Sequence, residues 1–76
     1  MDIRYILESL EERGYTFNIS AMGFQVWYRG VYIGGARTLD QAEDPVTKWQ
    51  YVQQYTREAI KIAEEHNNNN KREIIL

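Results

Sequence analysis

Apolar and polar side chains alternate along residues 15–33, apart from a short loop, as in strands with one buried face. The apolar set is Tyr15, Phe17, Ile19, Phe24, Val26, Tyr28, Val31 and Ile33. Arg29-Gly30 fits a two-residue hairpin turn. The pairs that this turn predicts are Tyr28 with Val31, Val26 with Ile33, and Trp27 with Tyr32. The stretch therefore predicts a three-stranded antiparallel meander whose outer face carries Trp27, Tyr32, Arg29 and Gln25.

The connection between the first two strands has two interpretations. A Met22-Gly23 turn and a four-residue loop Ser20–Gly23 both place the same apolar residues on one face, because the two registers differ by an even number of residues. Gly34-Gly35 weakens the end of the third strand and indicates either a bulge or the close approach of a helix.

The residues before the first strand have the periodicity of an amphipathic helix. Asp2 is a candidate N-cap, and Gly14 stands where a residue with positive φ often follows a helix. The apolar stripe at i, i+3, i+4 and i+7 consists of Ile3, Ile6, Leu7 and Leu10. We expect a helix that ends at about Arg13 and covers the core.

A second, longer helix is predicted from Pro45 to about His66. Thr38–Gln41 matches a capping box and indicates a short helical turn, and Asp44-Pro45 is a stronger start, with Asp as N-cap and Pro at the first helical position. Asn67–Asn70 is expected to end the helix. The predicted inner stripe is Val46, Trp49, Val52, Tyr55, Ala59, Ile62 and Ala63, widened by Tyr51 and Ile60. Within it we expect Trp49 to lie in the core and Tyr51 to be largely exposed.

These elements predict an α+β fold in the order helix, three-stranded antiparallel meander, long C-terminal helix, with the helices mainly on one sheet face. Residues 1–66 are expected to form one domain. Residues 67–76 are expected to be an Asn-rich linker and a short apolar tail, which is either frayed or added to the sheet as a strand. No apolar run approaches the ~18 residues that a membrane span needs, and no signal-peptide pattern is present, so we expect a cytoplasmic protein.

The residue types argue against catalysis. The chain has no cysteine and one histidine, His66, which we place near the end of the second helix where the dipole favours an imidazolium. Asp40, Glu43 and Asp44 do not match a calcium loop, and capping explains the position of Asp44. We therefore expect no enzyme, no metal site and no cofactor.

Charge is distributed unevenly along the chain. The net charge is −2, yet residues 15–39 contain two arginines and no acid. Trp, Tyr and Arg are the residue types most enriched among energetic anchors of protein interfaces. The predicted partner-binding residues are Trp27, Tyr32, Arg29, Gln25 and Arg37. An exposed cross-strand aromatic pair also stabilises a sheet by about 0.2–1 kcal/mol, so a purely structural role stays open.

The favoured hypothesis is a small non-enzymatic regulator or inhibitor that binds a protein. Its size and acidity are like those of phage and mobile-element products that block host nucleic-acid-handling complexes, anti-CRISPR proteins among them; this is an analogy and not a sequence match. In this hypothesis an acidic surface faces a basic channel on the target. Its predicted residues are Glu8, Glu11, Glu12, Asp40, Glu43 and Asp44.

Two other functions are alternatives to protein binding: nucleic-acid binding and the formation of a homodimer. The order helix–three strands–helix is also that of double-stranded-RNA-binding domains, and aromatic sheets stack bases, but this chain lacks a lysine cluster at the start of its second helix. Two sheet arginines would neutralise about two phosphates, against about 6–10 for a strong binder. The other alternative is a homodimer formed through the aromatic face or the apolar tail.

Overall fold

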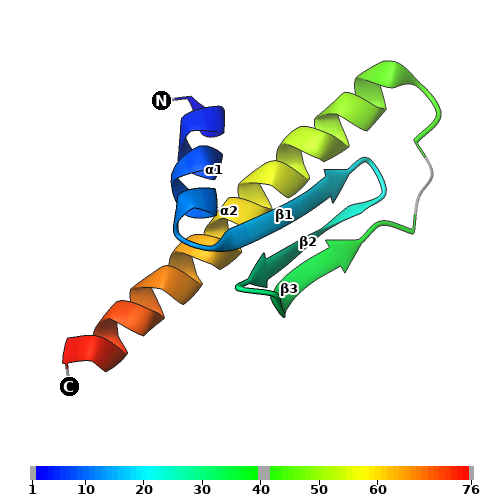
Figure 1. The fold of residues 1–76 in the computed structure, drawn as a ribbon. Coiled ribbons are helices and arrows are strands. Elements are labelled where there is room, and N and C mark those ends of the chain that lie inside the picture. Colours follow the sequence, from blue (N-terminus) through cyan, green and yellow to red (C-terminus); the bar gives the residue numbers. More distant parts are fainter. Residues whose placement is uncertain (1, 40–41, 76) are drawn as a thin grey trace.

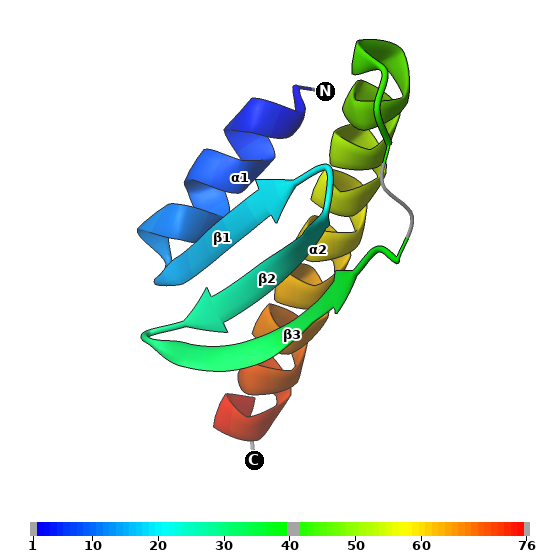
Figure 2. The same cartoon turned by 90° about the vertical axis from the view of Figure 1, so that its right-hand side faces the viewer.

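The computed structural model describes the backbone of residues 2–39 and 42–75 and the side chains of these ranges up to residue 69. The elements are α1 (Ile3–Glu12), β1 (Tyr15–Ser20), β2 (Gly23–Tyr28), β3 (Val31–Arg37) and α2 (Pro45–Ile75). The strands form one antiparallel sheet in the order β1-β2-β3, and both helices lie on the same side of it (Figures 1 and 2). The predicted α+β class and element order are confirmed.

Helix α1 forms as its sequence pattern predicts. The Asp2 carboxylate caps it by accepting a hydrogen bond from the Arg4 backbone N–H at 3.0 Å. Gly14, just beyond the helix, has a φ of +108°, which a glycine adopts without strain. Leu10 is buried, and the other residues of the apolar stripe pack against the same core.

The β1–β2 hairpin adopts the register of the four-residue interpretation. Ser20 pairs with Gly23 and Ile19 pairs with Phe24, so the predicted alternative of a Met22-Gly23 turn is wrong. The Ser20 hydroxyl accepts a hydrogen bond from the Met22 N–H at 3.2 Å and so stabilises the turn. The shared apolar face is as predicted.

The β2–β3 hairpin turns at Arg29 and Gly30, whose φ angles of +50° and +84° fit a type I′ turn. The predicted pairs Tyr28–Val31 and Trp27–Tyr32 are present. Val26 pairs with Gly34 instead of Ile33, because a β-bulge shifts the register between Val26 and Trp27. A Cβ on Gly34 would lie 3.2 Å from Ile62 Cδ1. The glycine pair therefore marks both a bulge and a close approach of α2.

Helix α2 begins as predicted but ends later. The Asp44 carboxylate accepts a hydrogen bond from the Thr47 N–H at 2.8 Å. The predicted end at His66 is wrong, because α2 continues through the four asparagines to Ile75. Asparagine disfavours a helix by less than about 1 kcal/mol per residue, and no Gly or Pro follows to break it. The tail up to Ile75 is thus neither frayed nor an added strand, and the division of the chain after residue 66 stays a prediction.

The capping box predicted at Thr38–Gln41 lies between β3 and α2. Two of its residues, Asp40 and Gln41, lie outside the described residues. The helical turn predicted there is therefore not described either. Thr38 donates its backbone N–H to the Met22 carbonyl at 2.9 Å, so the chain leaving β3 runs back toward the β1–β2 turn.

The core lies between the sheet and α2. Its buried side chains are Leu10, Tyr15, Phe24, Val26, Tyr55, Ala59, Ile60 and Ala63. Val26, Ala59 and Ala63 have no exposed surface, so the small side chains of α2 let its backbone approach the centre of the sheet.

Two aromatic residues of α2 have exchanged their predicted environments. Trp49 is 61% exposed, whereas Tyr51 is half-buried and stacks on Tyr55 with ring centroids 5.9 Å apart. The 31 residues of α2 span about 46 Å, whereas six or seven strand residues span about 20–23 Å. The helix therefore extends past the sheet at both ends (Figure 1), and Val46 and Trp49, in its first two turns, are exposed.

We expect Gly23→Ala to lower the free energy of unfolding by about 1–3 kcal/mol, since Gly23 has a φ of +146° and an added Cβ would overlap the Ala36 carbonyl oxygen. Gly30→Asn is the matched control: its φ is +84°, no atom lies within 4 Å of an added Cβ, and Asn tolerates positive φ. Urea denaturation measures both variants. Equal losses of stability would contradict the predicted crowding at Gly23.

Candidate functional site

The sheet face opposite the helices is the candidate site, and we call it the open face. Its side chains alternate along β1 and β2 and come from both sides of the bulge in β3; they are Thr16, Asn18, Ser20, Gln25, Trp27, Tyr32 and Arg37. Neither helix covers it (Figure 2). None of these residues is acidic, although the chain carries eleven carboxylate side chains.

An aromatic pair occupies one end of the open face. Trp27 and Tyr32 are cross-strand partners whose ring centroids lie 6.2 Å apart at an interplanar angle of 70°, an edge-to-face arrangement. Trp27 is half-buried by its neighbours on the sheet, and Tyr32 is 57% exposed. The Tyr32 hydroxyl lies 3.0 Å from the position that a Cβ of Gly35 would take. Tyr32 thus leans along β3 over a position that has no side chain.

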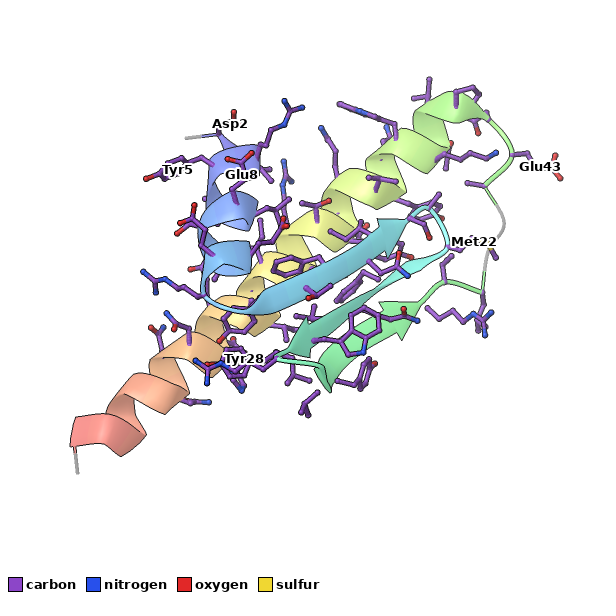
Figure 3. All side chains as sticks on the ribbon, in the orientation of Figure 1. Asp2, Tyr5, Glu8, Met22, Tyr28 and Glu43 are labelled. Atoms are coloured by element: carbon purple, nitrogen blue, oxygen red, sulfur yellow. The ribbon has the colours of Figure 1, made fainter. Side chains whose placement is uncertain are left out.

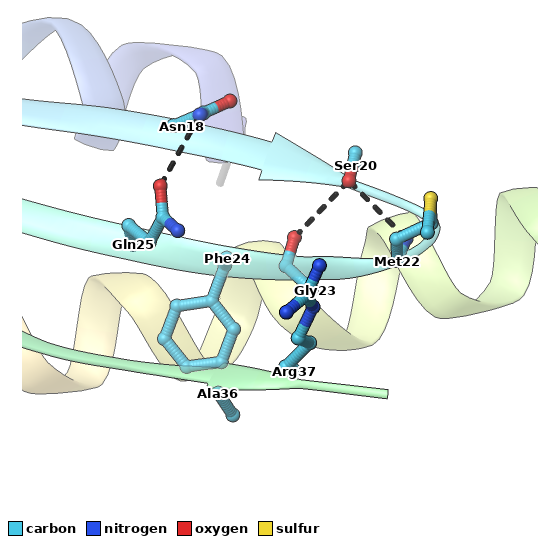
Figure 4. Close-up of a pocket in the computed structure, with 8 residues that line it drawn as sticks. All are labelled: Asn18, Ser20, Met22, Gly23, Phe24, Gln25, Ala36 and Arg37. Carbon is cyan, nitrogen blue, oxygen red and sulfur yellow. Dashed lines mark hydrogen bonds between the residues drawn. The ribbon is translucent and has the colours of Figure 1, made fainter. Parts of the chain in front are cut away.

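Polar groups and a shallow hollow occupy the other end of the sheet. Asn18 Nδ2 donates to Gln25 Oε1 at 3.3 Å across β1 and β2. The hollow next to this pair has a volume of about 310 Å³ (Figure 4). Its lining residues are Asn18, Ser20, Met22, Gly23, Phe24, Gln25, Ala36 and Arg37. Arg37 is exposed and supplies the cationic group of this end.

Arg29, predicted to share the outer face, lies elsewhere. Its guanidinium carbon is 5.2 Å from the centroid of the Tyr28 ring, and Tyr28 packs on the helix-covered side of the sheet. Its Cγ also lies beside Gly14. Its placement on the outer face is therefore wrong, while Trp27, Tyr32, Gln25 and Arg37 do share the open face.

The predicted acidic surface is not continuous. Glu8, Glu11 and Glu12 are exposed on α1, whereas Glu43 and Asp44 precede α2. Figure 3 shows Glu8 and Glu43 at well-separated parts of the molecule. Asp40 lies outside the described residues.

The carboxylate of Asp44 already has a structural role. Its hydrogen bonds from Thr47 hold its pKa below the usual range. Among the side chains described for residues 2–39 and 42–69, no three of His, Cys, Asp or Glu lie close enough to bind one metal ion. Nor do those residues contain a helix with the length and apolar composition of a membrane span.

Sequence analysis missed the environment of His66. With α2 extending to Ile75, His66 lies inside the helix, and its Nδ1 is 2.7 Å from the Tyr15 hydroxyl. The Tyr28 ring completes the cluster, with centroids 4.8 Å from His66 and 4.7 Å from Tyr15. Tyr15 is buried and His66 is half-buried, so this pair joins α2 to β1 at the edge of the core.

No family model, curated protein or solved structure that was compared with the chain matches it. A functional inference therefore depends on the surface chemistry of the described residues. The open face is the part of that surface where aromatic, amide and cationic groups meet.

The burial of Tyr15 predicts a pH-dependent stability. Burial raises the pKa of Tyr15, the neighbouring Tyr28 adds to this, and Arg13 opposes it. Because the folded pKa lies above the unfolded one, the stabilisation is complete below about pH 10 and is lost as pH rises through the folded pKa. We expect Tyr15→Phe to lose about 0.5–1.5 kcal/mol at neutral pH and to show a smaller further loss in alkali.

Urea denaturation between about pH 7 and 11 measures this difference. Tyr5→Phe is the control, because Tyr5 is exposed on α1. The free energy of unfolding of this variant should equal that of the parent chain at every pH. An alkaline loss in Tyr15→Phe as large as that of the parent would show that Tyr15 is not the titrating group.

Proposed function

We propose that this chain is a small non-enzymatic regulator or inhibitor that acts in the cytoplasm and binds a protein partner through its open face. The single observation that carries the proposal is the Trp27–Tyr32 pair on a sheet face that no helix covers. In the more specific form of the proposal, a phage or mobile element uses the chain to block a host nucleic-acid-handling complex. Its size and acidity support that form by analogy.

The composition of the open face resembles the centre of a protein interface. Two large rings lie beside amide groups and one arginine, and charged groups are few, as in interface cores. Three strands of six or seven residues present only about 300 Å² of sheet, against about 800 Å² per partner in a standard interface. The partner is therefore expected to contact adjoining surfaces as well.

Nucleic-acid binding has less support than protein binding. The rings could stack on bases, but with Arg29 turned to the other side only Arg37 contributes a positive charge to the open face. One cation would neutralise about one phosphate, too few for strong binding. Homodimerisation through the open face is compatible with the proposal and would compete with the partner.

Site-specific cross-linking tests the proposal. A photoreactive phenylalanine analogue at position 32 should cross-link a protein from lysate of the cells that carry the gene. The same group at position 5, exposed on α1, is the matched control and should not form that product. Adding Trp27→Ala should weaken capture at position 32 by about 30-fold or more, as for an interface anchor worth at least about 2 kcal/mol.

A circular-dichroism melt must show that the Trp27→Ala chain remains folded. Equal protein products from positions 32 and 5 would contradict a docking role of the open face. A product sensitive to nuclease would support the nucleic-acid alternative, and a product of twice the chain mass would support self-association.

A further inference from the structure

Strand β3 is an edge strand with a free side. The sheet order places it beside β2 only, and α2 is the sole helix that contacts it among the described residues. Figure 1 shows no described segment along its outer edge. An edge strand leaves every second set of backbone N–H and C=O groups without a strand partner.

The helix-facing side of β3 is also incompletely covered. Val31 is 64% exposed and Ala36 is exposed, although both belong to the apolar side of the sheet. Ile62 of α2 reaches β3 at Gly34, with Cδ1 3.2 Å from the position of an added Cβ. Ile62 therefore provides an apolar side chain beneath β3 itself, on the side of the sheet that a neighbouring strand would share.

The bulge limits the part of β3 that such a strand can use. After the register shift, Gly34 to Arg37 pair regularly with β2. Within this segment two glycines lack side chains, so a neighbouring chain can approach closely. Its alternate residues would then meet Ile62 on one side of the sheet, and Tyr32 and Arg37 on the other.

Charge and side-chain content indicate what would occupy this edge. Arg37 is exposed at its end, and none of the strand residues is acidic. A second copy of β3 could pair antiparallel with the first so that the helix-facing residues of both copies lie on the same side of the extended sheet. Glycine would then lie beside glycine at the centre, and little apolar side-chain surface would be buried. An acidic strand of another protein fits the charge and supplies the missing side chains.

We infer that β3 binds an extended segment of the partner protein as a fourth strand, with apolar side chains toward Ile62 and an acidic side chain beside Arg37. This inference deepens the proposed function, since it names how the partner chain is held. Four residues of pairing make a short ladder, so the segment adds to binding through the open face and does not replace it.

The test uses a capped peptide, Glu-Val-Thr-Val-Glu, titrated to about 5 mM into the isotopically labelled protein and followed by NMR. Because valine alternates with the other residues, both valines lie on the side of the sheet that faces Ile62. A glutamate at each end places one carboxylate near Arg37 whether the peptide pairs parallel or antiparallel to β3. We expect saturable shifts of the backbone amides from Tyr32 to Arg37. The peptide with lysine in place of glutamate should bind at least about five-fold more weakly, since one attraction becomes a repulsion.

Two controls assign the effect. Arg37→Gln should remove the difference between the acidic and basic peptides, whereas Arg57→Gln, an exposed arginine of α2, should keep it. N-methylation of the three central peptide residues should abolish the shifts, because these residues can then donate no strand hydrogen bond. The absence of shifts at β3, or equal binding of both peptides to the parent chain, would overturn the inference.

The outcomes are separable from those for the proposed function. Cross-linking at position 32 with no peptide binding at β3 would refute the fourth strand and leave the open face as the docking surface. Peptide binding at β3 without a cross-linked protein would refute the docking role of the open face alone.

Discussion

The packing of α2 on one face of the sheet is the interaction on which the rest of the structure depends. Val26, Ala59 and Ala63 are fully buried at this contact, and α1 adds Leu10 to the same layer. A chain of 76 residues has enough apolar side chains for one such layer, which leaves it a two-layer fold. The open face is a consequence of this limit. A sheet with both helices on one side must present its other side to whatever surrounds it.

The difference in length between α2 and the strands explains most of the exposed apolar surface. A helix of about 46 Å crosses a sheet of about 20–23 Å, so its ends extend past the strands, and Trp49 near its beginning is exposed. The helix lies mainly over β1 and β2, and it covers β3 only in part. Ile33 packs against the core and Ile62 lies beneath Gly34, whereas Val31 and Ala36 are exposed. The same geometry that completes the core thus leaves one strand with an unpaired edge.

Local patterns predicted much of this from the sequence, and the failures have physical causes. Alternation identified the strands, and the turn at Arg29-Gly30 identified the Trp27–Tyr32 pair. The direction of the Arg29 side chain was not predictable, because a backbone with a φ of +50° takes the residue out of strand alternation. The contact of His66 with Tyr15 joins residues 51 positions apart, and its prediction needed the true end of α2. That end depends on a marginal preference of asparagine, which local patterns do not settle.

The separation of charge makes the open face and the β3 edge parts of one surface. All acidic side chains precede residue 15 or follow residue 39, so the open face presents hydroxyls, amides, rings and an arginine but no carboxylate. Tyr32 and Arg37 belong to both features, since they point from β3 onto the open face and flank its free edge. Because the open face alone is smaller than a stable interface requires, a strand added at this edge would widen the sheet at the place where the aromatic pair already lies. A partner that used both would bury Tyr32 between its own strand and the Trp27 ring, which is the position of an interface anchor.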